Sequence, residues 1–137
     1  MRARKNDDER RTVRVLLGLR KSFPPYPTPL VAKCEAALET PMGDLSLEQL
    51  RLLISQRLGL DQLISKALDT LEQDPAISVT FCEGDLLKAC LSAPPEFWNG
   101  RANQATRLAD IAARFSEDGT GVVEARVAFM KSLEEAT

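Results

Sequence analysis

The strongest constraint on the fold is the apolar periodicity of residues 60–71. Apolar side chains recur there at the spacing i, i+3, i+4, i+7, i+8 and i+11: Leu60, Leu63, Ile64, Ala67, Leu68 and Leu71. This spacing places all six on one face of an α-helix. Residues 46–58 form a second helical pattern that opens on a capping box, Ser46 followed three residues later by Gln49. We expect Gly59 to end that helix as a left-handed glycine, so that the two helices form a tight αα-hairpin.

The rest of the chain also favours helices, because Leu and Ala dominate its apolar residues and aromatic residues make up only 5%. The patterns predict helices at about 8–21, from Thr28 to before Pro41, and at 84–91, 101–115 and 121–135. The expected fold is therefore all-α, a compact bundle of about six to seven helices with the αα-hairpin at its centre. The side chains expected to face inward outside the hairpin include Leu17, Leu30, Val31, Leu108, Ala109, Phe115, Val122, Val123, Val127, Met130 and Leu133. Leu47 is expected to face inward at the start of the hairpin.

One segment, residues 76–81, has a β-like alternation of apolar and polar residues. It has no second strand to pair with. We interpret it as an extended connector that buries Ile77, Val79 and Phe81 in the core.

Charge is distributed unevenly along the 137 residues, a length that fits one domain. Residues 1–21 hold eight basic and three acidic residues, and the remainder holds ten basic and seventeen acidic residues. We expect residues 1–8 to be a disordered polar arm and residues 9–137 to form one helical domain. An acidic body suits a basic partner and repels nucleic acid, although a solvated surface without partner preference explains it equally well. Nucleic-acid binding through residues 2–21 is a minor alternative, since this arm has no aromatic stacking platform.

Residue types that carry chemistry are sparse. The chain has no histidine, and its three cysteines match no metal-ligand spacing. We therefore predict no catalytic residue, no cofactor and no metal site, and we expect Cys34, Cys82 and Cys90 to be buried and reduced. The sequence has no convincing targeting segment and no apolar run of the ~20 residues that a membrane span needs. A cytoplasmic protein that does not enter membranes is expected.

The stretch FCEGDLLKACLSAPPEFW, residues 81–98, concentrates the remaining candidates. Glu83 and Asp85 could act as an acid–base pair, but such a pair needs a cleft and a raised pKa on one member. Both lie at the start of the helix at 84–91, where acidic groups complement the helix dipole and cap free N–H groups. We favour capping over catalysis, and a buried Trp98 over an exposed binding residue.

The run from Tyr26 to Trp98 resembles the immunity proteins of bacterial contact-dependent growth inhibition (CDI) systems. The resemblance rests on an ordered combination: Leu30-Val31 with Cys34 and Leu38, Pro41 and the Leu45 region, LEQLRLLISQRLGLDQLISKALDTLEQDP (47–75), GDLLKACL (84–91) and FW (97–98). The helices at 101–135 lie beyond it. The resemblance implies a cytoplasmic protein that is not an enzyme. It would bind the toxic C-terminal domain delivered by a neighbouring cell and block it.

Many toxins of such systems are nucleases with basic clefts, which an acidic surface would fit, so association should be sensitive to salt. Exposed polar residues near the hairpin and in the 83–96 segment are the candidate partner-binding residues: Asp61, Gln62, Asp69, Glu83, Asp85 and Glu96. The alternative is that Asp85 caps a helix and the others are solvated. At the level of function, the alternative is a helical adaptor of an intracellular complex without a toxin partner. A monomer is slightly favoured over an oligomer.

Overall fold

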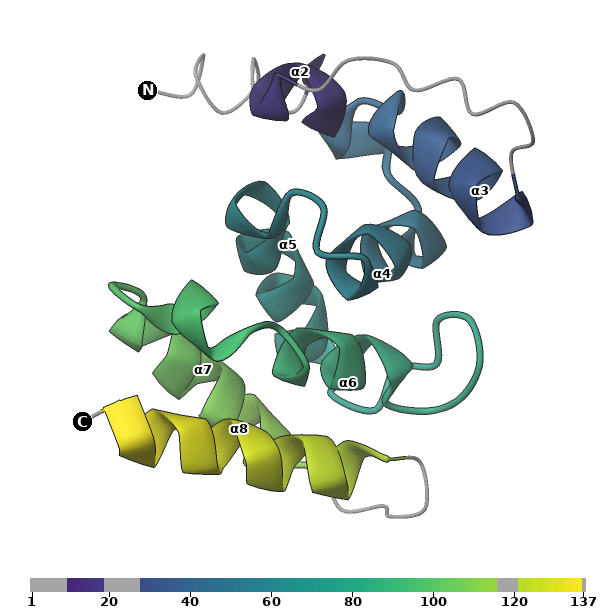
Figure 1. The fold of residues 1–137 in the computed structure, drawn as a ribbon. Coiled ribbons are helices and arrows are strands. Elements are labelled where there is room, and N and C mark those ends of the chain that lie inside the picture. The colour runs from purple at the N-terminus through teal and green to yellow at the C-terminus, as the bar shows by residue number, and fades with distance from the viewer. Residues whose placement is uncertain (1–9, 19–27, 116–120, 137) are drawn as a thin grey trace. The chain divides into compact units, whose positions relative to one another are not determined.

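The computed structural model describes residues 10–18, 28–115 and 121–136 (Figure 1). Regular structure in these ranges is helical throughout and contains no strand, which confirms the all-α prediction. The elements are α2 (Val13–Leu17), α3 (Pro29–Leu38), η1 (Met42–Asp44), α4 (Leu47–Ser55), α5 (Leu60–Gln73), α6 (Asp85–Leu91), η2 (Pro95–Trp98), α7 (Ala102–Ala113) and α8 (Val122–Ala136), where η marks a 3-10 helix. The predicted disordered arm and most of the proline-rich segment 22–29 lie outside the described residues.

The chain divides into two units, residues 1–62 and residues 63–137. In the first unit, α3 packs against α4. Thr28, where this helix was predicted to start, is the N-cap of α3, and its hydroxyl accepts a hydrogen bond from the Val31 backbone N–H at 3.1 Å. The single domain expected over residues 9–137 and the hairpin geometry at Gly59 stay predictions.

Helix α2, which falls within the helix predicted at about 8–21, is shorter than expected. It begins after Thr12, whose hydroxyl accepts a hydrogen bond from the Val15 N–H, and it ends at Gly18, which takes the left-handed conformation at φ 66°. The prediction of a helix reaching residue 21 is therefore wrong at its C-terminal end. Arg14 is buried and forms ion pairs with Glu35 and Glu39 of α3. These two ion pairs connect α2 to α3.

The capping box at the start of α4 is confirmed, with Ser46 and Gln49 each accepting a hydrogen bond from the other's backbone N–H. The end of α4 differs from the prediction. The residue that leaves the helix in the left-handed conformation is Arg57, at φ 61°, and not Gly59. The Leu58 N–H donates to the Leu53 carbonyl at 2.8 Å, the six-to-one hydrogen bond of a Schellman motif. Gly59, at φ 78°, instead belongs to the turn that opens α5.

Helix α5 matches the sequence pattern that defined it, since all six predicted positions are buried. In the second unit, α8 packs against α6, α7 and η2, and Figure 1 shows α8 running beside α6 and α7. The Trp98 and Phe129 rings meet edge to face at 5.4 Å, and Phe97 meets Trp98 in the same manner at 4.9 Å. Trp98 is thus buried, as predicted.

The predicted inward face of α8 is wrong in part. Val122 is buried, but Val127 and Met130 are exposed and Phe129 takes the inward position. The physical reason is the contact of Phe129 with Trp98, which fixes the rotation of the helix. Other apolar residues expected inside are exposed at helix ends or edges: Leu17, Leu30 and Leu47. In α7, Ile111 is buried while Ala109 is only half-buried.

Candidate functional site

The loop at residues 76–84, between α5 and α6, is organised by one carboxylate. Asp85 accepts hydrogen bonds from three consecutive backbone N–H groups, those of Val79 at 2.9 Å, Thr80 at 2.7 Å and Phe81 at 2.8 Å. Hydrogen bonds to an ionised acceptor at these distances are of the stronger kind. Asp85 is buried, so these bonds supply the partners that a buried carboxylate requires.

Further contacts close this 76–84 loop at its base. Ser78 and Glu83 form an isolated antiparallel bridge. The Gly84 N–H points at the carbonyls of Ala76 and Ile77, at 3.1 and 3.2 Å. Gly84 adopts φ +81°, and a Cβ there would lie 2.9 Å from side-chain atoms of Phe115 and Val122. Only glycine fits this position without displacing its neighbours.

Two predictions for this segment are wrong. Asp85 does not cap α6: the N-cap is Gly84, which makes no side-chain capping bond, and the Asp85 carboxylate points back to the loop. Phe81 is not in the core but 76% exposed, the highest value among the large apolar side chains that the structure describes. Both errors have one cause. The Asp85 carboxylate binds the backbone N–H groups of residues 79–81, and this arrangement leaves the Phe81 side chain in solvent.

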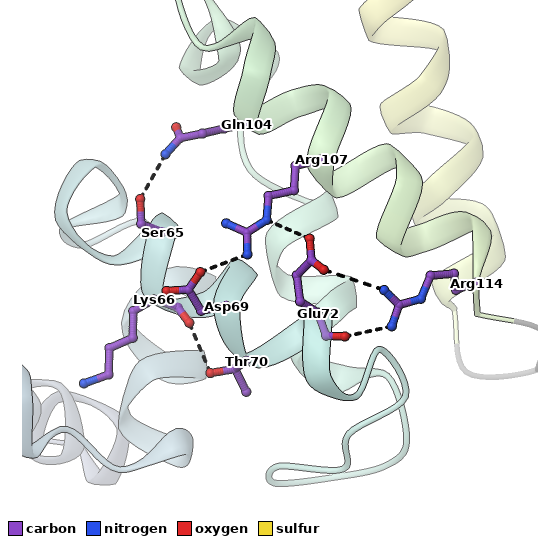
Figure 2. Close-up of polar contacts among 8 residues, drawn as sticks. All are labelled: Ser65, Lys66, Asp69, Thr70, Glu72, Gln104, Arg107 and Arg114. Carbon is purple, nitrogen blue, oxygen red and sulfur yellow. Dashed lines mark hydrogen bonds and ion pairs between the residues drawn. The ribbon is translucent and has the colours of Figure 1, made fainter.

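A polar seam joins α5 to α7 (Figure 2). Arg107 lies between two carboxylates of α5 and donates to Asp69 at 2.8 Å and to Glu72 at 2.9 Å. These hydrogen bonds raise the pKa of Arg107 further above its ordinary value, first through Asp69 and then through Glu72. Arg114 donates to the Glu72 carbonyl at 2.8 Å, and the Gln104 amide donates to the Ser65 hydroxyl at 3.1 Å. The seam is a structural contact between two helices.

The six predicted partner-binding residues fall into different environments. Asp61, Glu83 and Glu96 are exposed. Gln62 is half-buried, and its Oε1 accepts no hydrogen bond from the described residues. Asp69 is exposed but engaged by Arg107, and Asp85 is buried, so the expectation of an exposed Asp85 is wrong. The sequence placed Phe81 in the core and gave no sign of the ion pairs that Arg107 forms with Asp69 and Glu72.

The cysteines also differ from one another. Cys90 is buried as predicted, and burial raises the pKa of its thiol to about 12. Burial, followed by the charge of Glu35, raises the pKa of the half-buried Cys34. Cys82 is exposed, so its predicted burial is wrong, because it lies in the loop tip that Asp85 turns outward. Among the residues described, no cluster of Cys, Asp and Glu could hold a metal ion.

The basic N-terminal segment is described only at residues 10–18. Within that range Arg14 faces Glu35 and Glu39 and is buried, so this cation is directed into the protein and not toward phosphate. No helix in the described part of the chain is both long and apolar enough to cross a membrane.

The described residues define a small helical protein with an ordered loop that exposes an aromatic side chain. Comparison with known families identifies it further. The chain belongs to the family of CDI immunity proteins, whose model matches residues 17–108, about two thirds of the chain. Proteins of this family have an immunity role and are generally non-enzymatic. No curated protein matches the sequence.

The family match begins before Tyr26 and extends beyond Trp98 into α7. It includes the whole 76–84 loop, all of α5 and both Asp69 and Glu72. Helix α8 lies outside it.

Proposed function

We propose that this chain binds the toxin C-terminal domain of a contact-dependent growth inhibition system in the cytoplasm and neutralises it by covering a surface that the toxin needs. The observation that carries the proposal is the family match over residues 17–108. The charge of the chain supports a basic partner, since residues 22–137 hold ten basic and seventeen acidic residues. Inhibition by association needs no catalytic group on the immunity protein.

Within this proposal, the exposed carboxylates Glu83 and Glu96 meet basic groups of the toxin domain directly, together with Asp61 and Gln62. Asp69 reaches the partner only if the partner competes with Arg107 for its carboxylate. Asp85 contributes indirectly by shaping the 76–84 loop. Charge pairs of this kind accelerate association and make it sensitive to ionic strength.

Co-expression with the toxin domain encoded beside this chain tests the proposal. We expect growth rescue and co-elution of the two proteins. Rescue without co-elution, or co-elution without rescue, would contradict neutralisation by binding. Failure of both would favour the helical adaptor without a toxin partner.

The electrostatic part has its own measurement. Isothermal titration or surface plasmon resonance at 50 and 500 mM salt should show weaker binding at high salt, and Glu83→Gln should reduce that dependence. Glu124→Gln is a matched control, because Glu124 is an exposed glutamate of α8 outside the family match. Salt-independent affinity, or equal effects of the two variants, would contradict the assignment of an acidic interface around Glu83.

A further inference from the structure

We propose that the 76–84 loop is the docking element for the toxin domain and that Phe81 enters an apolar pocket of that domain rimmed by Lys or Arg side chains. The inference rests on the proposed function and adds the part of the surface that supplies most of the affinity. It is carried by the exposure of Phe81, the hydrogen bonds that fix its backbone, and the charge of the surrounding sequence.

An aromatic side chain left in water forgoes the favourable free energy of burial. Phe81 is 76% exposed, whereas Phe115 and Phe129 of the same unit are 4% and 2% exposed. The alternating pattern of residues 76–81 predicted that Phe81 would be buried in the core, but the fold leaves this side chain exposed. The exposed ring is typical of the aromatic anchors that dominate protein–protein binding.

The backbone that carries Phe81 is fixed before any partner arrives. The Asp85 carboxylate receives the N–H groups of Val79, Thr80 and Phe81, and the Asp85 N–H donates to the Cys82 carbonyl at 3.2 Å. The Ser78–Glu83 bridge closes the loop below the tip. A side chain presented on an ordered backbone loses little further conformational entropy on binding, which raises affinity.

The charge of the sequence around the 76–84 loop indicates which side chains should surround the toxin pocket that receives Phe81. Between Lys66 and Lys88 the sequence contains five acidic residues and no basic residue. Asp69 and Glu72 face Arg107, and Asp85 faces the loop backbone. Asp74 and Glu83 are the exposed acids of this stretch that flank Phe81 in the sequence. An apolar anchor beside carboxylates fits an apolar pocket with a basic rim.

The loop also carries a built-in reporter for the test, since Cys82 is exposed beside Phe81. In the full-length wild-type protein, iodoacetamide labelling followed by mass spectrometry should modify Cys82. Saturating toxin domain should slow that labelling at least tenfold. Cys90 serves as an internal control because it is buried and its thiol has a pKa of about 12. Unchanged labelling of Cys82 in a complex that forms would overturn the proposal.

Variants test the same loop by affinity. Phe81→Ala should weaken toxin binding at least tenfold, chiefly through faster dissociation, while Glu83→Gln should mainly slow association at low salt. Val127→Ala is the matched control, because Val127 is an exposed apolar residue of α8, 59% exposed. Binding of Phe81→Ala within threefold of wild type, or an equal loss with Val127→Ala, would overturn the proposal.

Asp85→Asn tests the positioning role, because it keeps the size of the side chain and removes its charge. We expect Asp85→Asn to weaken toxin binding although the Phe81 side chain is still present. Circular dichroism checks that the Asp85→Asn protein is folded. A folded Asp85→Asn protein that binds like wild type would contradict the positioning role.

The outcomes separate this inference from the proposed function. Tight wild-type binding with an unaffected Phe81→Ala variant overturns the loop assignment alone. Absence of wild-type binding to the toxin domain overturns both. A concentration-dependent dimer without toxin that disappears in Phe81→Ala would identify a second copy of this chain as the occupant and would also overturn the proposal.

Discussion

Replacing Gly84 with alanine should destabilise the second unit more than the same substitution at Gly100. The φ of +81° at Gly84 costs a non-glycine residue roughly 1–2 kcal/mol. The new Cβ would also lie 2.9 Å from Phe115 Cε2 and from Val122 Cγ2. Both neighbours are buried and have little room to retreat, and overpacking of this kind typically costs about 1–3 kcal/mol. We therefore expect a total loss of about 2–5 kcal/mol.

Urea denaturation followed by circular dichroism measures this loss, with Gly100→Ala as the control. Gly100 lies in the same unit at φ +75°, but a Cβ added there would meet nothing within 4 Å. Its substitution therefore isolates the backbone cost of roughly 1–2 kcal/mol. The difference between the two variants gives the steric part. Equal losses for Gly84→Ala and Gly100→Ala would refute the close packing of Gly84 against Phe115 and Val122.

Three further predictions concern the helix end, the polar seam and the cysteines. Arg57→Gly should stabilise the protein by about 1 kcal/mol in urea denaturation, because glycine accepts φ 61° without strain, whereas Gln56→Gly, at φ −89°, should not. Arg107→Ala should cost about 1 kcal/mol or less, with a smaller effect in 1 M salt, because its ion pairs are partly exposed; a loss unaffected by salt would contradict this. Burial raises the pKa of Cys90 from 9.0 to about 12, so an unfolded chain loses this proton at a lower pH than the folded one. The contribution to stability is complete below pH 9 and is lost as pH rises from 9 to 12, by up to about 1.4 kcal/mol per pH unit, and Cys90→Ala should remove that slope; an unchanged slope would argue against burial of the thiol.

The local signals in the sequence were sufficient for several elements. The six-position stripe of α5 has one consistent helical face, so burial follows from periodicity alone. The capping box at Ser46 and Gln49 depends on contacts three residues apart, and it formed as predicted. Where two apolar residues are neighbours, as Phe129 and Met130 are, periodicity does not decide which one faces inward. Contact with Trp98, 31 positions away, decided it.

The candidate site was harder to predict for the same reason. Arg107 meets Asp69 and Glu72 across more than 30 residues of sequence, and no local pattern indicates that pairing. Asp85 is the first residue of α6, directly after the N-cap Gly84, and only the course of the preceding loop turns its carboxylate backward. Once the loop is held in this way, Phe81 faces water. The stretch at residues 81–98, with its two cysteines, three carboxylates and Trp98, was the sequence signal that pointed to this region.

Because Asp85 binds only backbone N–H groups, the conformation of residues 79–81 does not depend on which side chains these residues carry. The carboxylate holds peptide N–H groups, and every residue other than proline supplies that same group. Substitutions at Val79, Thr80 or Phe81 therefore alter what the tip offers to a partner without removing the bonds that set its course. Single substitutions in this loop can therefore change the surface that a partner recognises, while the loop backbone and the helices on either side of it keep their structure.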